Sequence, residues 1–235
     1  MEINRLNWDS NFFKREVFAA FINAGDKEDG RSLLDALRDK DAELAYIFLK
    51  EDNSGWHKQL TAMNARLFDE KITYSKICNS LHTDIPSNVI AYNGSLTDEL
   101  LQLTLLSGHE SRFKKDPLLQ PYFESLYRLW IEKSLEGVIA DKVFVYRVGE
   151  SIKGMVTCKA ANGVGNIGLI ATASSEQGKG IGKALIHAVD VYYQEDKVHT
   201  SHVVTQGANK QACMFYEKSG FTKYKQEYVY HWWFK

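Results

Sequence analysis

The sequence predicts a mixed α/β protein in which a small α/β domain, residues 1–87, precedes a larger α/β domain, residues 88–235. Apolar residues make up 44% of the chain and charged residues 25%, a balance typical of globular proteins. Segments with alternating apolar residues are interspersed with segments of helical periodicity. The polar stretch 79–87, which contains Pro86, separates two apolar runs and indicates the domain boundary.

The first domain is predicted to hold two helices and two strands. Apolar residues at helical spacing predict helices over 31–37 and 56–68. Alternating apolar residues predict strands over 43–49 and 71–77. We therefore expect a small α/β unit.

Two helices open the second domain. The first is predicted over 96–106, with Ser95 as its N-cap, because a serine side chain accepts a hydrogen bond from the first helical turn. The second is predicted over 117–135 and carries its apolar residues on one face. Three strands follow, and Gly149-Glu150 between the first two is typical of a tight hairpin. These strands are predicted over 143–148, 152–158 and 166–171.

The rest of the chain alternates helices with strands. A helix over 180–193 and a strand over 201–206 precede a helix over 208–219 and a final strand region over 221–234. The aromatic residues of this last region are expected to pack the strand, and they suit a homodimer interface. They are Tyr228, Tyr230, Trp232 and Trp233.

The charge balance and the cysteines argue against several classes of function. The formal net charge is -1 and the basic residues form no block, which argues against nucleic acids and anionic membranes as partners. Cys78, Cys158 and Cys213 are widely spaced, so neither a disulfide framework nor a metal site is expected. The N-terminus lacks the apolar core of a signal peptide, and no apolar run reaches the ~18 to 20 residues of a membrane span. A cytoplasmic protein is expected.

Three alternating glycines, Gly178, Gly180 and Gly182, join a predicted strand to a predicted helix. A helix N-terminus offers unpaired N–H groups and partial positive charge to a phosphate, and glycine lets such a ligand approach the backbone. The pattern is not a P-loop, which needs Ser or Thr where Ala184 stands. Nor is it a dinucleotide fingerprint, which needs glycine where Lys183 stands. A glycine turn without a ligand stays open as the alternative.

Two motifs together resemble the GCN5-related N-acetyltransferase (GNAT) superfamily. Residues 177–182, Gln-Gly-Lys-Gly-Ile-Gly, resemble its coenzyme A pyrophosphate loop, Gln-x-x-Gly-x-Gly. Residues 209–221 resemble its second signature, Asn-x-x-Ala-x-x-Phe-Tyr-x-x-x-Gly-Phe. The resemblance covers residues 88–235. It implies the acyl-CoA N-acyltransferase fold, with acetyl-CoA as co-substrate and no metal.

The resemblance also implies how the coenzyme is held. The strand before the turn would present backbone groups to the pantetheine amides, and the turn would receive the pyrophosphate. Asn209 would bind the pantetheine arm or cap its own helix. The implied coenzyme-binding residues are Leu169, Ile170, Ala171, Gln177, Gly178, Lys179, Gly180, Ile181, Gly182 and Asn209.

Tyr216 is the implied catalytic acid. The resemblance places its hydroxyl beside the thioester sulfur, where it can give a proton to the departing thiolate. The alternative is a core aromatic residue, since Ala212 and Phe215 share its helical face. No general base is indicated, because the strand before the turn has no acidic residue. A water relay, His109 or Glu110 would have to act as the general base.

Shorter segments are similar to one branch of the superfamily, whose enzymes acetylate dTDP-fucosamine (dTDP-4-amino-4,6-dideoxygalactose) for surface polysaccharides. They are residues 6–13, Leu-Asn-Trp-Asp-Ser-Asn-Phe-Phe, and Arg112-Phe113 followed by Tyr122. This similarity implies a dTDP-amino sugar as the amine substrate, with Arg112 at its diphosphate and Phe113 or Tyr122 at the sugar or thymine. An exposed ion pair is the alternative for Arg112.

Other functions stay open at this point. The acceptor amine of a GNAT enzyme can also belong to a protein, a polyamine or an antibiotic. A module that binds acyl-CoA without catalysis is a further alternative, although such a module would not need a proton donor at Tyr216.

Overall fold

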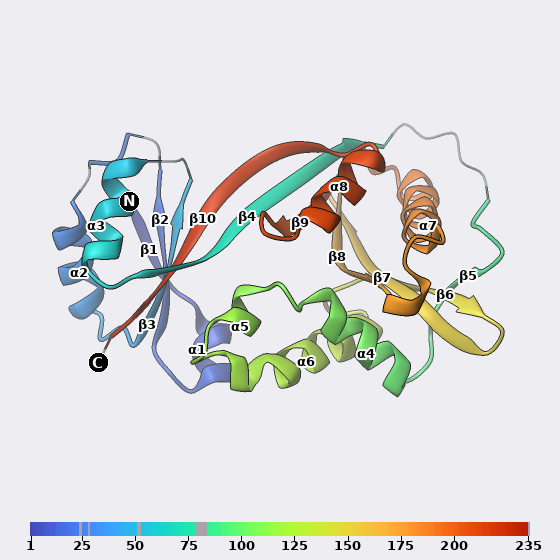
Figure 1. The fold of residues 1–235 in the computed structure, drawn as a ribbon, viewed down its shortest axis with the longest axis horizontal. Coiled ribbons are helices and arrows are strands. Elements are labelled where there is room, and N and C mark those ends of the chain that lie inside the picture. The colour runs from blue at the N-terminus through green and yellow to red at the C-terminus, as the bar shows by residue number, and fades with distance from the viewer. Residues whose placement is uncertain (24, 28, 51–52, 79–83, 235) are drawn as a thin grey trace. The chain divides into compact units, whose positions relative to one another are not determined.

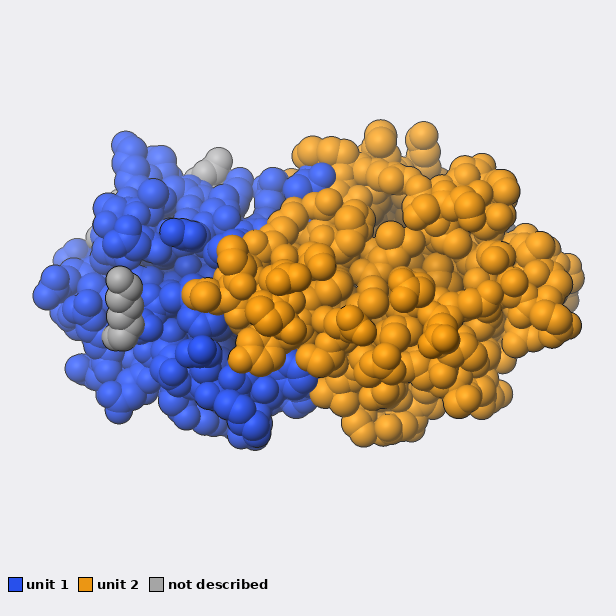
Figure 2. Space-filling view, turned by 60° about the horizontal axis from the view of Figure 1, so that its bottom comes forward, with its two compact units in different colours: residues 1–72, 206–208, 225–235 blue, residues 73–205, 209–224 orange. Residues whose placement is uncertain are grey.

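The computed structural model of the chain describes all residues except 24, 28, 51–52, 79–83 and 235. It confirms the predicted mixed α/β fold. The chain divides into two compact units, which Figure 2 colours separately. Unit 1 consists of Met1–Ile72, Gln206–Ala208 and Lys225–Lys235, and unit 2 of Thr73–Thr205 and Asn209–Tyr224.

The sheet of unit 1 has the strand order β1-β2-β3-β10 (Figure 1). β2 and β3 are parallel, with Val17 opposite Leu44, whereas β1 and β10 are antiparallel to their neighbours. The end of the chain therefore completes the sheet that its beginning starts. The strands are β1 (Glu2–Arg5), β2 (Val17–Ile22), β3 (Leu44–Leu49) and β10 (Thr222–Trp233).

Two helices cover one face of the unit 1 sheet. The side chains of Asp29 and Asn53 cap their N-termini by accepting hydrogen bonds from backbone N–H groups of the first turn. Their apolar residues share one core with β2, β3 and β10. This core includes Leu33, Leu37, Ile47, Trp56, Leu60, Tyr230 and Trp232. The helices of the unit are α1 (Asn7–Phe13), α2 (Gly30–Arg38) and α3 (Ser54–Ala62).

The sheet of unit 2 has the order β4-β9-β8-β7-β6-β5, with the beginning of β10 next to β4. β5 to β8 are antiparallel neighbours, and β8 and β9 are parallel. Because parallel strands need a crossover, a helix connects β8 to β9. The strands are β4 (Arg66–Ile77), β5 (Val89–Ala91), β6 (Lys142–Val148), β7 (Ser151–Ala161), β8 (Val164–Thr172) and β9 (Thr200–Gln206), and the first seven residues of β4 belong to unit 1.

Helices cover both faces of the unit 2 sheet. α4 and α6 share a core with β6, β7 and β8 that includes Met155. The neighbouring Gly154 points to the opposite face, where a Cβ would lie 2.6 Å from Ile181 of α7. α7 therefore packs closely on that face. The helices are α4 (Asp98–Ser107), α5 (Arg112–Lys115), η1 (Gln120–Tyr122), α6 (Phe123–Leu135), η2 (Ser174–Glu176), α7 (Ile181–Glu195) and α8 (Lys210–Lys218).

Several local predictions were wrong. The helix predicted over 56–68 ends at Ala62, and its last three residues belong to β4, since pairing in the sheet overrides their helical spacing. Thr97, not Ser95, caps α4, with its hydroxyl accepting a hydrogen bond from Leu100 N at 3.3 Å. The sequence patterns also missed β1, α1, β2, β5 and α5, all of seven residues or fewer.

The units divide the chain differently from a single boundary near residue 87. Unit 1 takes residues 225–235 from the end of the chain, because β10 pairs with β3. Of the predicted boundary segment, 79–83 lies outside the described residues, and 84–87 belongs to unit 2. Within the described ranges, every helix is too short or too polar to cross a lipid bilayer.

Candidate active site

The glycine turn leads from η2 into α7. Gly178 and Gly180 have φ angles of 79° and 82°, in the left-handed region that favours glycine. A Cβ at either position would meet no described atom within 4 Å. Gly182 differs, because a Cβ there would lie 3.0 Å from the Phe215 ring. Two glycines thus shape an open turn, and the third lets α7 approach α8.

The N-terminus of α7 is open to a ligand. Gly180 is its N-cap, and no side chain of the described residues caps the helix. The first helical hydrogen bond runs from Ala184 N to Gly180 O at 3.0 Å. The N–H groups of residues 181–183 therefore have no acceptor in the helix, and α7, at 15 residues, adds its dipole.

The strand before the turn separates from its parallel neighbour. Pairing between β8 and β9 ends at Ile167 opposite Val203, although β8 continues to Thr172. A bulge lies at the same place, where Leu169 N donates to Thr157 Oγ1 at 2.8 Å. Ile170, Ala171 and Thr172 thus pair with β7 and, among the described residues, with no residue of β9, so one edge of β8 is open there.

α8 carries the second group of site residues. Asn209 caps the helix, with its Oδ1 accepting from Ala212 N at 3.0 Å. Tyr216 is 4% exposed, and burial raises the pKa of its hydroxyl, with the nearby Cys213 adding to the effect. Gln211 reaches the glycine turn, where its Nε2 donates to Gln177 Oε1 at 3.2 Å.

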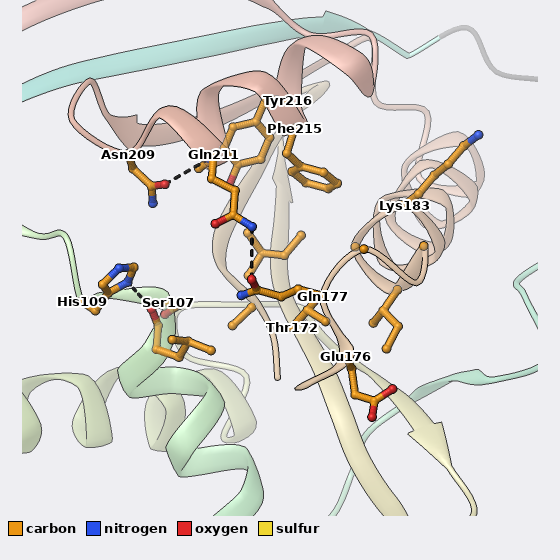
Figure 3. A pocket seen from close by; sticks show the side chains of 18 residues that line it. Ser107, His109, Thr172, Glu176, Gln177, Lys183, Asn209, Gln211, Phe215 and Tyr216 are labelled. Carbon is orange, nitrogen blue, oxygen red and sulfur yellow. Dashed lines mark hydrogen bonds between the residues drawn. The ribbon is translucent and has the colours of Figure 1, made fainter. Parts of the chain in front are cut away.

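A cavity of about 320 Å³ lies among these elements (Figure 3). That volume is within the range of small-molecule sites. All of its lining residues belong to unit 2. They are Leu106, Ser107, His109, Ile170, Ala171, Thr172, Glu176, Gln177, Gly178, Gly180, Ile181, Gly182, Lys183, Asn209, Gln211, Ala212, Phe215 and Tyr216.

About half of the chain matches a known protein family. Residues 122–233 match the family model described as the acetyltransferase (GNAT) domain. The chain is an N-acetyltransferase that carries a GNAT domain over these residues. Enzymes with this fold use acetyl-CoA, so the cavity of the acetyltransferase is a candidate for its binding site.

Solved structures share this fold over most of the length of the acetyltransferase. A GCN5-related N-acetyltransferase from Sphaerobacter thermophilus superposes with a TM-score of 0.60 at 12% identity, covering 98% of this chain and 76% of its own. A tandem GNAT protein from the clavulanic acid biosynthesis pathway has a TM-score of 0.56 at 14% identity, and the match covers 92% of this chain and 75% of its own. A glucosamine N-acetyltransferase region of a fungal multi-domain β-N-acetylglucosaminidase has a TM-score of 0.54 at 11% identity, and the match covers 98% of this chain and 31% of the fungal one. No curated protein matches the acetyltransferase in sequence.

The residues of the cavity fit the diphosphate and pantetheine parts of acetyl-CoA. Gly178 and Gly180 leave space that a side chain would take up, and the start of α7 offers unpaired N–H groups. The one-sided edge of β8 offers backbone groups at the spacing of a strand, which suits the two amides of pantetheine. The amino-acid side chains thus contribute less to this fit than the backbone does.

The structure brings most of the predicted coenzyme residues of the acetyltransferase to one place. Ile170, Ala171, Asn209 and all of Gln177–Gly182 except Lys179 line the cavity. Lys179 instead extends its Nζ to Glu176 Oε2, 3.0 Å away. Leu169 packs against the core of α4, α6 and β6–β8.

The residues predicted to bind a nucleotide sugar lie outside the cavity lining. Arg112 and Phe113 are at the start of α5, with the Arg112 guanidinium carbon 4.5 Å from the centre of the Phe113 ring. Phe113 also meets the edge of Trp130. Tyr122 ends η1, and its carbonyl accepts from Ser125 Oγ. The three residues thus lie on α5 and η1, two elements that contact each other.

Sequence reasoning missed several lining residues. Lys183 in the first turn of α7 and Gln211 in the first turn of α8 adjoin the two motifs, so their position next to a ligand site was a usable signal. Leu106 and Ser107 at the end of α4 gave no such signal, because helix packing alone brings them there. His109, considered as a general base, does line the cavity.

Proposed function

We propose that the protein transfers the acetyl group of acetyl-CoA to the amino group of a dTDP-linked amino-deoxy sugar. The observation that supports acetyl transfer most directly is one cavity. It is lined by the open glycine turn, the open edge of β8 and Tyr216. The turn suits a diphosphate, the open edge of β8 suits the pantetheine amides, and Tyr216 is the proposed proton donor.

Tyr216 would act as the general acid. Bound acetyl-CoA supplies the acetyl group as a thioester. As the acceptor nitrogen bonds to the acetyl carbon and the C–S bond breaks, the Tyr216 hydroxyl gives its proton to the sulfur. Because burial raises the pKa of this hydroxyl, Tyr216 stays protonated at neutral pH and is ready to donate.

The charges of the cavity favour an anionic acceptor over a polycation. A polyamine or basic peptide would call for several carboxylates, and the described lining contains only one, Glu176. Lys179 lies 3.0 Å from that carboxylate. Lys183 adds a positive charge to the lining instead, while the start of α7 is assigned to the diphosphate of the coenzyme.

An amino sugar is supported by two further points. Arg112 follows the α4–α5 connection that lines the cavity, and a guanidinium suits a diphosphate. A region of similar fold, in the fungal enzyme named above, is described as a glucosamine N-acetyltransferase. The sugar and its nucleotide are therefore the acceptor class that we propose.

The experiment is a panel of acceptors with acetyl-CoA, measuring thiol release. The panel contains dTDP-4-amino-4,6-dideoxygalactose, glucosamine, spermidine, an aminoglycoside and a peptide with a free N-terminus. We expect the highest kcat/KM for the dTDP sugar. A higher value for any other amine would contradict the proposed acceptor.

A matched pair of variants tests the diphosphate contact. Arg112→Lys keeps the charge and loses the planar fork, so KM for the dTDP sugar should rise about tenfold, the effect of ~1.4 kcal/mol. Arg128→Lys is the control, because Arg128 lies on α6 and its guanidinium only approaches Glu132, at 3.9 Å. Equal KM values for the two variants would contradict a contact between Arg112 and the diphosphate.

A further inference from the structure

The cavity contains an imidazole whose environment suits proton transfer from the acceptor amine. His109 lies just beyond the end of α4 and lines the cavity together with Tyr216 (Figure 3). Its side chain is 54% exposed. The other ionisable groups of the described lining are Glu176, Lys183 and Tyr216. Of the four, only the neutral imidazole can donate a hydrogen bond with one nitrogen and accept a proton with the other.

The backbone fixes which nitrogen of His109 is basic. Nδ1 lies 3.0 Å from the carbonyl oxygen of Leu106. A carbonyl oxygen can only accept, so Nδ1 carries the hydrogen and donates it. In the neutral ring, Nε2 therefore bears the lone pair.

A carboxylate stands beside this basic nitrogen. Glu110 Oε1 is 3.4 Å from His109 Nε2, within the distance of an ion pair once the ring has taken up a proton. Lys115 Nζ lies 2.6 Å from the other carboxylate oxygen, and this hydrogen bond holds the pKa of Glu110 below its usual range. Glu110 is thus ionised at neutral pH and stabilises an imidazolium at His109.

We propose that His109 is the general base, with Nε2 taking the proton that the acceptor amine loses; this rests on the proposed acetyl transfer. The nitrogen of the amine gives its proton to Nε2 and bonds to the acetyl carbon, while Tyr216 protonates the departing sulfur. The exposed imidazolium then releases its proton to water, and the Tyr216 phenolate takes up a proton from water, which restores both groups. Glu110 is a positioning residue that stabilises the charged ring.

The first test does not depend on turnover. Nitrogen-15 NMR of the protein with acetyl-CoA, with the His109 signals identified by their loss in His109→Gln, reports the tautomer of the neutral ring. We expect the Nδ1–H tautomer. The Nε2–H tautomer would overturn the proposal, because Nε2 would then have no lone pair to accept the proton.

The second test measures kinetics with the most reactive amine of the panel. His109→Gln should lower kcat/KM about a hundredfold or more, flatten the acidic side of its pH profile, and leave the Kd of acetyl-CoA from calorimetry unchanged. Glu110→Gln should lower kcat/KM less and shift the acidic side. His199→Gln is the control, since His199 is an exposed histidine outside the cavity lining and should behave as wild type.

The outcomes separate the two proposals. A panel in which another amine reacts best contradicts the dTDP sugar and still tests His109 with that amine. A His109→Gln variant with wild-type kcat/KM and an unchanged acidic side overturns the base assignment alone. Should no amine of the panel react, the proposed acceptor is contradicted, and an Nε2–H tautomer would still overturn the base assignment.

Discussion

Tyr216 shows how much a single residue depends on its surroundings. The motif predicts a proton donor and the helical face predicts a core residue, and the structure combines both, since the side chain is buried and also lines the cavity. Sequence spacing could not show this. Burial arises from residues far away in the chain, such as Tyr74, whose ring centre is 5.8 Å from that of Tyr216.

Tyr216→Phe removes the hydroxyl and keeps the ring. We expect kcat to fall by about 10²–10⁴ while the Kd of acetyl-CoA changes little, because proton donation matters only as the C–S bond breaks. Tyr224→Phe is the control, since Tyr224 is 69% exposed and lies outside the cavity. Steady-state kinetics and calorimetry decide; parallel losses of kcat and affinity would contradict the role.

Burial of Tyr216 also affects stability at high pH. Its pKa is raised in the folded protein, so the unfolded state loses this proton first as pH rises through about 10. The stabilisation is complete below that pH and is lost above it. The free energy of unfolding should therefore fall less steeply between about pH 9 and 11 in Tyr216→Phe than in Tyr224→Phe. Urea titrations at several pH values measure this, and identical slopes would refute it.

At the scale of elements, the glycine turn and the start of α7 were predictable because their pattern is local. Three glycines in alternation need only their own φ angles to form the turn. The one-sided edge of β8 was not predictable in this way, because it depends on where pairing with β9 ends. The missed elements β1, α1 and β2 are short, and their packing within unit 1, rather than their periodicity, holds them.

The turn can be tested against a glycine of equal strain. Gly180→Ala and Gly137→Ala each force alanine into a left-handed conformation, at φ 82° and 76°, with a cost of about 1–2 kcal/mol. Both sites have open space, but only Gly180 lines the cavity. We expect the Kd of acetyl-CoA to rise at least about tenfold in Gly180→Ala alone. Equal affinities in calorimetry would rule out the turn as the phosphate site.

A second pair of variants separates the role of Asn209 as the N-cap of α8 from its role in coenzyme binding. Asn209→Ala and Thr97→Ala each remove an N-cap side chain, and each should lower the free energy of unfolding by about 1 kcal/mol. Asn209 also lines the cavity, so its variant should additionally bind acetyl-CoA more weakly. If both variants bind alike, Asn209 is a cap and nothing more.

At the scale of the whole molecule, the boundary between the units is where sequence reasoning had least to work with. A break in composition marks a linker, but it does not show that a later strand returns to an earlier sheet. Tyr230 and Trp232 of β10 belong to the core formed by α2 and α3. A contiguous segment at the start of the chain therefore lacks part of its own core.

Residues 1–87 alone should consequently remain unfolded. The fragment lacks the strand that pairs with β3 from Leu44 to Leu49, together with the aromatic residues of β10. Circular dichroism and the dispersion of amide signals in NMR measure this. A peptide covering residues 222–235 should restore structure when it is added, and cooperative unfolding of the fragment by itself would contradict the shared core.

The pairing of β10 with β3 also determines when unit 1 can be completed during translation. On the ribosome, residues 225–234 are made only after all of unit 2 has been translated. Domains usually fold as they emerge, N-terminal first. Here one side of β3 stays without its partner strand β10 until unit 2 has been made. During that time the backbone groups of this side are unpaired and the apolar residues around it are not fully covered. That interval is when the growing polypeptide is most exposed to aggregation and to chaperones.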